Sequence, residues 1–318
     1  MSGPTSARSV ATTPAPTGKT VLVTGGAGFV GSHLAAALAK ENDVRILDDF
    51  SSGKRENLPE ATTLVEGDVR DPNAVREAMD GVDLVFHEAA MVSVERSVER
   101  PLRSHAVTTD GSLVVLNRAR REDARVVLAS SAAVYGHPDS VPVSESERKR
   151  PTSPYGIDKL TADLYARQFC DLYGLETVVL RYFNIYGSRQ NPEYSAVVRV
   201  FLDQARRGDP ITIEGDGTQT RDFVHVSDVV QANLSAATTD RTGEAFNIGT
   251  GESVPIRELA ETVRDVTDSD SDIVHTDPRP GDIDHSRADV SRAREALGYE
   301  PTVSLSEGLA SLVREITA

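Results

Sequence analysis

The sequence predicts an α/β fold in which a doubly wound parallel sheet of the Rossmann type is followed by a second, smaller α/β domain. Three observations lead to this class. Short aliphatic runs alternate with helical patterns through the first half of the chain, as in right-handed βαβ units. A glycine-rich turn over residues 25–31 separates the first aliphatic run from a helix. After Tyr186 the pattern is too broken for another full sheet.

The predicted strands of the first half are short and apolar, and they cover residues 20–23, 44–47, 63–65, 82–86, 125–128 and 177–180. Helices are predicted over 31–39, where Leu34 and Leu38 share a face, and over 71–79, which has a proline in its first turn. In the second half we expect helices over 196–206, 256–266 and 291–297, and extended segments over 223–226 and 245–248.

The chain divides into three predicted parts. Residues 1–17 are rich in Ser, Thr, Ala and Pro and lack an apolar signal core, so we expect a disordered tail and a cytoplasmic protein. Residues 18–184 form the predicted nucleotide-binding domain. Residues 185–318 form the predicted substrate domain, with some segments within 223–250 returning to the sheet.

Composition limits the possible partners. The net charge is −15, with 49 acidic against 34 basic residues, and only five of the basic residues are lysines. This balance argues against nucleic acid as a partner. It is typical of proteins from salt-loving organisms, in which salt screens self-repulsion, although ordinary acidic solubility is the alternative. No run approaches the roughly 18 apolar residues that cross a bilayer. The single cysteine, Cys170, and scattered histidines predict no disulfide and no metal site.

The glycine-rich turn predicts a dinucleotide site. Gly25, Gly28 and Gly31 follow a strand and open a helix that begins with Phe29 and Val30. Glycines at this spacing permit a tight turn and let the backbone approach a pyrophosphate at the helix N-terminus.

Asp48 predicts which dinucleotide binds. It ends the second predicted strand, where a carboxylate binds the adenine-ribose hydroxyls and repels a 2′-phosphate. We therefore expect NAD rather than NADP. Asp49 is the rival ribose ligand, and the nearby cations Lys54 and Arg55 are the feature that would favour NADP.

Tyr155 and Lys159 predict the catalytic base. Residues four apart share one face of a helix, so Lys159 is expected beside Tyr155. A cation there is expected to lower the phenol pKa from its usual value of about 10, which makes the phenolate available as a base. Ser131 lies at the end of the apolar run 124–131, which contains the fifth predicted strand, and it completes the expected set.

Ten motifs in order give the chain a family resemblance from Lys19 to the C-terminus: TGGAGFVG, LDDFSSG, EGDVRD, FHEAA, SSAAVYG, YGIDK, RYFNIYG, TRDFVHVSD, FNIGTG and RPGD. This series resembles the extended short-chain dehydrogenase/reductases, and more narrowly the UDP-sugar 4-epimerases. The resemblance implies bound NAD, a UDP-sugar substrate held by residues 185–318, and a homodimer built on a helix bundle.

The same resemblance implies further roles. Asp68 and Val69 would flank the adenine, and Ala89 and Ala90 would line the pyrophosphate channel. Ser131 would orient the reacting sugar hydroxyl, and Lys159 would also hold the nicotinamide ribose. The UDP-sugar would be bound by Ser93, Asn184, Arg221, Arg279 and Asp282, together with Ser286, which would lie against the C2 substituent. A small residue there admits an N-acetyl group that a tyrosine would exclude.

Other interpretations of these residues stay open. A dehydratase or decarboxylase of the same fold needs an acid after the catalytic Ser, where this chain has Ala132 and Ala133. A UDP-glucuronate 4-epimerase is a further alternative, as is a catalytically dead regulator, although such regulators typically lose the Tyr or the Lys. Ser131 could be only a strand cap, Asn184 a turn cap, and Arg221 an ion-pair partner of Asp222. No role is predicted for Glu88.

Overall fold

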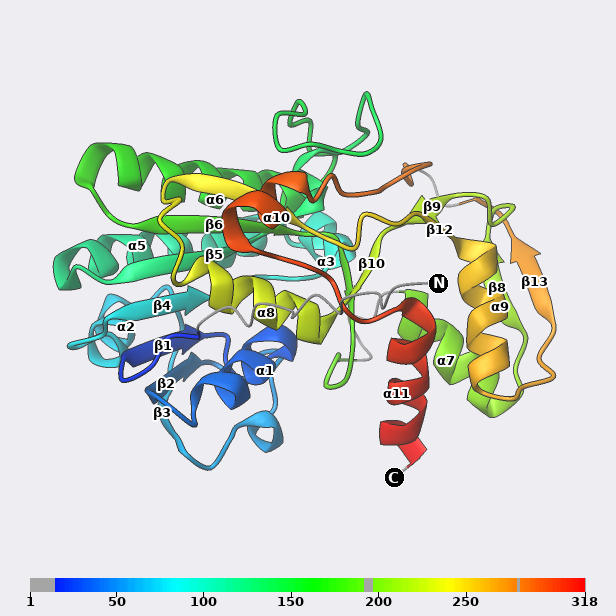
Figure 1. Cartoon of the computed structure of the whole chain (residues 1–318), viewed down its shortest axis with the longest axis horizontal. Helices are drawn as coiled ribbons and strands as arrows, with labels where there is room; N and C mark the ends of the chain where they lie inside the picture. Colours follow the sequence, from blue (N-terminus) through cyan, green and yellow to red (C-terminus); the bar gives the residue numbers. More distant parts are fainter. Residues whose placement is uncertain (1–14, 192–196, 279–280, 318) are drawn as a thin grey trace, which may run out of the picture.

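A seven-stranded parallel sheet forms the larger lobe of the structure, a computed structural model that describes residues 15–191, 197–278 and 281–317 (Figure 1). The strand order is β3-β2-β1-β4-β5-β6-β11, and every neighbouring pair is parallel. The strands are β1 (Thr20–Thr24), β2 (Asp43–Asp48), β3 (Thr62–Glu66), β4 (Leu84–His87), β5 (Arg125–Ser131), β6 (Thr177–Tyr182) and β11 (Glu244–Ile248). The predicted doubly wound α/β class is confirmed.

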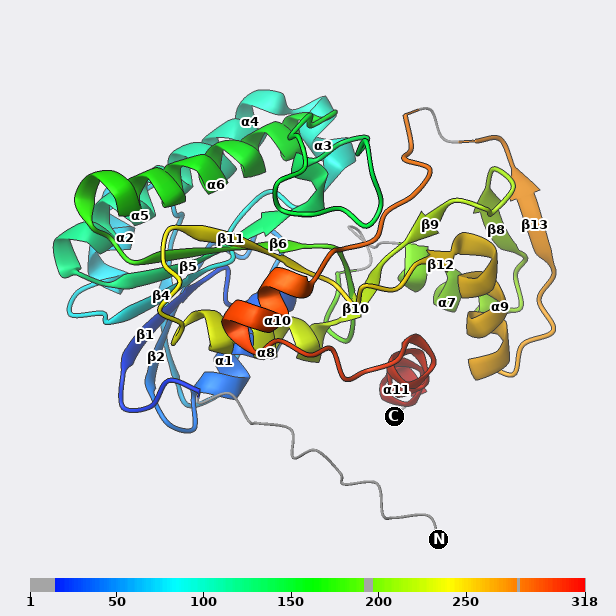
Figure 2. The same cartoon turned by 45° about the horizontal axis from the view of Figure 1, so that its top comes forward.

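Helices cover both faces of this sheet because successive strand side chains point to opposite faces. In β1, Val21 and Val23 belong to one buried cluster and Leu22 belongs to the other. One face carries α1 (Phe29–Leu38), α8 (Val226–Ala236) and α10 (Ser291–Leu297). The opposite face carries α2 (Pro72–Ala78), α5 (Gly111–Glu122) and α6 (Pro154–Tyr173), as Figure 2 shows.

Local sequence signals fix the start and end of α6, which carries the predicted base. The Ser153 side chain caps the helix by accepting a hydrogen bond from the Gly156 N–H at 3.1 Å. Pro154 occupies the first helical position, where no N–H is needed. Gly174 ends the helix in the left-handed conformation, with φ of +69°.

A smaller lobe has its own core, seen at the right of Figure 1. Its buried cluster includes Phe201, Ile213 and Leu259, all of which come after residue 186. Its helices are α7 (Val197–Arg207), α9 (Ile256–Val266) and α11 (Leu305–Thr317). Its strands form three two-stranded sheets. The pairs are β8 (Ile211–Glu214) with β13 (Ile273–Thr276), β9 (Thr220–Arg221) with β12 (Val254–Pro255), and β7 (Asn184–Tyr186) with β10 (Phe223–His225).

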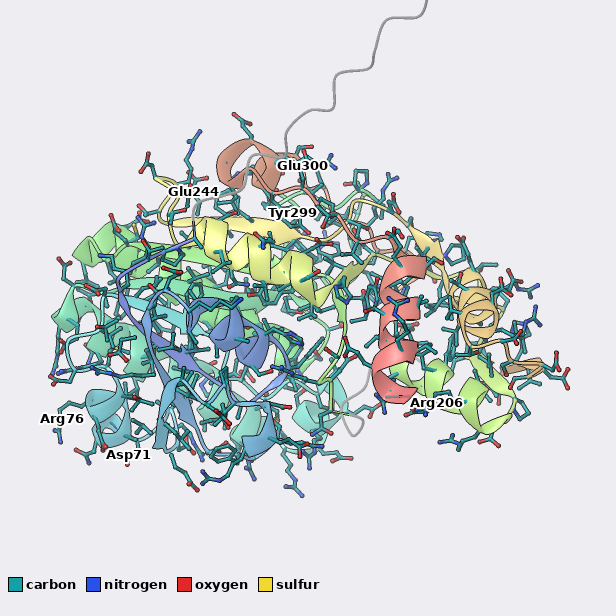
Figure 3. All side chains as sticks on the ribbon, turned by 60° about the horizontal axis from the view of Figure 1, so that its bottom comes forward. Asp71, Arg76, Arg206, Glu244, Tyr299 and Glu300 are labelled. Atoms are coloured by element: carbon teal, nitrogen blue, oxygen red, sulfur yellow. The ribbon has the colours of Figure 1, made fainter. Side chains whose placement is uncertain are left out.

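The chain crosses between the lobes more than once. Where it returns to the sheet as β11, contacts with α10 and the residues after it hold the strand in place. Glu244 on β11 is ion-paired with Arg292 on α10. The Tyr299 hydroxyl, just beyond α10, donates a hydrogen bond to the Gly249 carbonyl at 2.8 Å. Figure 3 shows Glu244, Tyr299 and Glu300 gathered around this helix.

The predicted strands agree with the observed ones to within three residues at each end, and 245–248 joins the sheet beside β6 as expected. The segment 223–226 does not join it, because β10 pairs with β7 outside the seven strands. The helices α3 (Val94–Glu99) and α4 (Pro101–His105) were not predicted, since elements this short show no periodicity. Most of the predicted tail, residues 1–14, lies outside the described residues. No described helix is long and apolar enough to cross a membrane.

Candidate active site

The glycine-rich turn lies at the carboxyl edge of the sheet, between β1 and α1. Gly25 has φ of +67°, a conformation that side chains other than glycine rarely adopt. A Cβ atom at Gly31 would collide with the Gly25 carbonyl oxygen, so both positions need glycine. Gly28 occupies the N-cap of α1 and supplies no side-chain cap. The amides of the first helical turn therefore face the cavity beside them, as an anion site requires.

A cavity of about 620 Å³ runs along this edge, and all of the predicted cofactor residues line it. Gly25, Gly28, Phe29, Val30 and Gly31 form one wall. The others are Asp48, Asp68, Val69, Ala89, Ala90, Tyr155 and Lys159. Neighbouring parallel strands thus deliver their carboxyl ends to one elongated site, the place where open α/β sheets bind ligands.

Asp48 ends β2 with a buried carboxylate. Its two oxygens accept hydrogen bonds from the Ala27 N–H at 2.9 Å and the Phe50 N–H at 2.8 Å. Burial raises the pKa of Asp48, and the two amides oppose that shift. The rival Asp49 is exposed and closes a turn instead, because its carboxylate accepts from the Ser51 N–H at 2.9 Å. Asp48 therefore has the placement that a ribose ligand needs.

The two cations that would favour NADP are each paired with a carboxylate. Lys54 Nζ lies 3.1 Å from Glu56 Oε1, and both residues line the cavity. Arg55 is ion-paired with Glu66 and stacks over the Phe50 ring at 4.4 Å. With both cations paired and the Asp48 carboxylate at the end of β2, the residues at this end of the cavity fit NAD.

The two pairs that the resemblance implied near the adenine and the pyrophosphate also lie on the cavity wall. Asp68 is held by Arg70, whose hydrogen bonds lower the Asp68 pKa, and Val69 is buried beside it. The Ala89 N–H donates to Thr24 Oγ1 at 3.3 Å, which ties the β4 end to the glycine-rich turn.

Ser131, Tyr155 and Lys159 meet at the other end of the cavity. A hydrogen bond joins Ser131 to Tyr155. Ser131 Oγ also accepts from the Ala133 N–H at 3.1 Å, so it caps a short turn as well. The Tyr155 N–H donates to Ser97 Oγ at 3.1 Å, which fixes the start of α6. The structure thus brings together the three predicted catalytic side chains.

The expected effect of Lys159 on Tyr155 is wrong. Lys159 is buried, and its ammonium donates to the Ala129 carbonyl oxygen at 2.7 Å. The pKa of Tyr155 is raised by burial, lowered by the Ser131 hydrogen bond and raised again by Glu88. The sequence spacing placed the lysine on the correct helix face, but it could not reveal a backbone acceptor from β5.

Glu88 and Tyr182 belong to the same end of the cavity, and sequence reasoning assigned neither a role. The Tyr182 hydroxyl donates to Glu88 Oε1 at 2.9 Å, and both side chains line the cavity. The signal that could have found them is their position at the ends of parallel strands. Tyr182 is the register partner of Ser131 across β5 and β6, and Glu88 directly follows β4, so all three sit at one sheet edge.

The residues predicted to bind substrate are more dispersed. Asn184 lines the cavity and begins β7, where its N–H donates to the Asp222 carbonyl, so it is no turn cap. Ser93 caps α3 and lines a neighbouring cavity of about 290 Å³ with Arg96, Arg100 and Arg103. The two cavities adjoin, since both are lined by the segments around Ser51, Ala90 and Val107.

Arg221 and Asp282, 61 residues apart, form an ion pair at 2.5 Å outside these two cavities. Arg221 therefore does not form the alternative ion pair with Asp222. The Asp222 carboxylate instead accepts backbone N–H groups such as that of Ala288 at 3.0 Å. Ser286 is buried, and its N–H donates to the Thr220 carbonyl at 3.1 Å. It does not line the described cavities. Arg279 lies outside the described residues.

Within the described ranges, no group of three or more His, Cys, Asp or Glu side chains is placed to hold a metal ion. The side chains that this end of the cavity offers for proton transfer are Ser131, Tyr155, Lys159 and Glu88.

Comparison with known proteins places this geometry in context. Residues 21–249 match the profile of the NAD dependent epimerase/dehydratase family. A UDP-glucose 4-epimerase of Mycolicibacterium smegmatis is 37% identical over 302 residues, which cover 92% of this chain and 96% of that protein. Relatives at 34–35% identity include proteins named as a UDP-glucuronic acid decarboxylase and a UDP-N-acetyl-glucosaminuronate decarboxylase.

Solved structures agree with the sequence relatives. A UDP-glucose 4-epimerase of Thermotoga maritima with UDP-glucose is 38% identical, has a TM-score of 0.90, and the match covers 94% of this chain and 100% of that one. A UDP-N-acetylglucosamine 4-epimerase of Methanobrevibacter ruminantium M1, in complex with UDP-N-acetylmuramic acid, is also 38% identical, with a TM-score of 0.89 and the same coverage. A UDP-glucose 4-epimerase of Thermus thermophilus was solved in complex with NAD.

Proposed function

Since the chain belongs to the NAD-dependent epimerase/dehydratase family, we propose that it is a UDP-hexose 4-epimerase, which interconverts UDP-GlcNAc with UDP-GalNAc, UDP-glucose with UDP-galactose, or both. One observation carries the proposal. The hydrogen-bonded Ser131 and Tyr155 lie with Lys159 in the same cavity as the glycine-rich turn and Asp48. A proton acceptor and a dinucleotide site therefore share one enclosed volume.

The residues of this cavity divide the work. NAD held along residues 25–31 and Asp48 would supply the acceptor and donor of the hydride at sugar C4. Tyr155 takes the proton of the 4-hydroxyl and later gives it back, as a general base and acid. Ser131 favours the phenolate through its hydrogen bond. We propose that the same hydroxyl orients the sugar. Lys159 is held by Ala129 and faces the cavity.

Dehydration and decarboxylation are less well supported. Elimination from a 4-keto sugar needs an acid or base beside its C5 or C6. Ala132 and Ala133, which follow Ser131, form a short 3₁₀ turn and supply no ionisable group. Glu88 does line the cavity, but its carboxyl group is engaged by the Tyr182 hydroxyl. Returning the hydride is therefore the step that this set of residues supports best.

The smaller lobe supplies the proposed UDP contacts. Arg221 is anchored through Nη1 to the Thr220 and Ile283 carbonyls at 2.8 and 2.7 Å, and through Nη2 to Asp282. A guanidinium fixed in this way loses little freedom on binding a diphosphate. We propose that Arg221 and Asp282 act with Asn184 and Arg279 on the UDP moiety, and that Ser286 leaves room for an N-acetyl group.

The direct test supplies the purified protein with UDP-GlcNAc, UDP-glucose or UDP-glucuronate in separate reactions, without added NADH. The products are separated by anion-exchange chromatography and identified by NMR. We expect the 4-epimer, with no net change in nicotinamide absorbance. Formation of a 4-keto-6-deoxy product would refute the proposal, as would release of CO₂ from UDP-glucuronate with no epimer. A Tyr155→Phe preparation controls for contaminating epimerase.

A homodimer is the second part of the proposal. The helices α4 and α6 pack side by side (Figure 2). They carry exposed apolar residues, with Leu102 87%, Ile157 51% and Leu164 50% exposed. Exposed apolar surface that is contiguous marks protein interfaces, and we propose that these residues form one. We expect light scattering to give the dimer mass for the wild type and the monomer mass for Leu164→Asp. Val200→Asp, on the exposed side of α7, is the matched control.

A further inference from the structure

Glu88 is an ionisable group in the catalytic cavity that the proposed reaction does not use. It follows β4 and receives a hydrogen bond from the Tyr182 hydroxyl at 2.9 Å. Tyr182 is held in turn by Asn233 of α8, whose amide donates to the Tyr182 oxygen at 2.9 Å and to the Val229 carbonyl at 2.8 Å. Burial raises the pKa of Tyr182 well above its usual value, so its hydroxyl stays protonated and can donate this hydrogen bond. The Glu88 carboxyl group is therefore fixed in place.

We propose that Glu88 is a positioning residue that holds the Lys159 side chain in its ammonium form, and so sets the alkaline limit of the pH range in which that ammonium is available to the reaction. The effect of Glu88 and Lys159 on catalysis rests on the proposed epimerase function, whereas the interaction between their charges is independent of it.

Burial and charge act in opposite directions on this pair. Burial lowers the pKa of Lys159 to about 8, and the Glu88 carboxylate opposes that shift. Burial raises the pKa of Glu88 to about 7, and Lys159 and the Tyr182 hydrogen bond oppose it. Glu88 also raises the pKa of Tyr155. Removing the carboxylate leaves burial to act alone on Lys159, so its pKa must fall.

The other groups around Glu88 do not replace it. From β4, His87 is buried and neutral, because burial, reinforced by Lys159, lowers its pKa to about 3. From β5 the site receives the Ser131 hydroxyl, and from α8 the Asn233 amide, neither of which carries charge. Arg181, next to Tyr182, is directed to Asp163 at 2.8 Å. Glu88 directly follows His87, whose register partner on β5 is Leu128, and the Lys159 ammonium donates to the next β5 residue, Ala129. The Glu88 carboxyl group therefore stands at the strand end beside the Lys159 ammonium, and its charge raises the Lys159 pKa.

The composition of the chain makes Lys159 directly observable. Only Lys19, Lys40, Lys54, Lys149 and Lys159 contribute signals when the protein is labelled with ¹³Cε-lysine. The Lys159 signal is the one lost in Lys159→Met. In the full-length protein we expect its titration midpoint near pH 8, as the Lys159 pKa indicates. In Glu88→Gln, which preserves side-chain volume, we expect it roughly one pH unit lower or more, the size of shift a nearby opposite charge produces.

Two further variants keep the test decisive. Glu261→Gln removes one negative charge from the exposed side of α9 and is expected to leave the Lys159 midpoint unchanged. Tyr182→Phe removes the hydrogen bond that favours the Glu88 carboxylate and is expected to shift the midpoint in the same direction by less. It also replaces Glu88→Gln if that variant fails to fold. A Lys159 midpoint within about 0.3 pH units of wild type in the folded variants overturns the proposal, since a real carboxylate partner shifts it further.

The pH profile of kcat/KM supplies a second readout. Because Lys159 would lose its proton at lower pH, the alkaline limb of Glu88→Gln is expected to move to lower pH. A purely structural role would depress the rate at every pH without moving the limb. If the Lys159 signal shifts but no UDP-sugar is epimerised by the wild type, the proposed function fails and the Glu88 inference stands. If the wild type epimerises UDP-sugars but the signal does not move, the Glu88 inference fails and the proposed function stands.

Discussion

Replacing Asp48 with Asn should relax the preference for NAD over NADP. Asp48 accepts one backbone N–H on each carboxylate oxygen, and its burial leaves the charge poorly screened. A carboxylate that binds the ribose hydroxyls would lie about 5 Å from a 2′-phosphate. At an effective dielectric constant of about 20, two unit charges at that distance repel by about 3 kcal/mol, roughly a 10²-fold difference in affinity. Asn removes this charge while keeping the shape.

The substitution also has a structural cost. Asn keeps one acceptor oxygen, and its amide group faces the second backbone donor, either Ala27 or Phe50. An unsatisfied buried N–H costs about 1–3 kcal/mol, so stability and NAD affinity should both decline. The affinity ratio for the two dinucleotides isolates the electrostatic effect, because this loss applies to both of them.

Calorimetry on nucleotide-free protein measures the ratio. We expect the wild type to bind NAD at least 10²-fold more tightly than NADP, and Asp48→Asn to lose most of that difference. Asp49→Asn, at the exposed neighbour, should leave the ratio within about twofold, since charges in water interact weakly. A ratio unchanged in Asp48→Asn would refute the electrostatic reasoning. Equal wild-type affinities would mean that Lys54 and Arg55 already neutralise Asp48.

Four further outcomes are expected. Tyr155→Phe should lower kcat by about 10²–10⁴-fold with little change in melting temperature, and near-normal turnover would defeat its role as base. Asp163→Asn strands the buried Arg181 and should cost about 3–5 kcal/mol in urea unfolding, against about 0–1 kcal/mol for Asp139→Asn in an exposed pair. Melting temperature should rise from low to molar KCl as self-repulsion is screened, and a flat response would favour ordinary acidic solubility. Ser286→Tyr should lower kcat/KM for UDP-GlcNAc more than for UDP-glucose, and an unaffected N-acetyl reaction would refute the specificity proposal.

The sheet and the nucleotide end were predictable because their signals are local. Each strand is one short apolar run, and each ligand side chain directly follows such a run. Asp48 therefore lies where β2 ends and Ser131 where β5 ends. Parallel strands bring these ends to one edge whatever their separation in sequence. Tyr155 and Lys159 share a helix face for an equally local reason.

The features that the sequence missed depend on contacts between distant segments. The Lys159 ammonium donates to Ala129, a backbone oxygen 30 residues away. The Arg221 guanidinium on β9 pairs with Asp282, which lies 61 residues away, rather than with its neighbour Asp222. Periodicity and spacing carry no information about either partner. For this reason neither the pKa shifts around Lys159 nor the partner of Arg221 could be predicted from the sequence.

We propose that the division between local and long-range contacts also separates chemistry from specificity in this molecule. The proposed proton and dinucleotide groups stand on β1, β2, β4, β5 and α6, which belong to one sheet and a helix packed against it. Arg221, Asp282 and Ser286 stand on short strands and loops of the smaller lobe, tied together by a few backbone hydrogen bonds such as that from Ser286 to Thr220. Substitutions in those loops can change which sugar fits while the reacting groups keep their positions. On this basis, relatives that differ in substrate should differ first around residues 281–286, and the cavity end formed by Ser131 and Tyr155 should tolerate the least change.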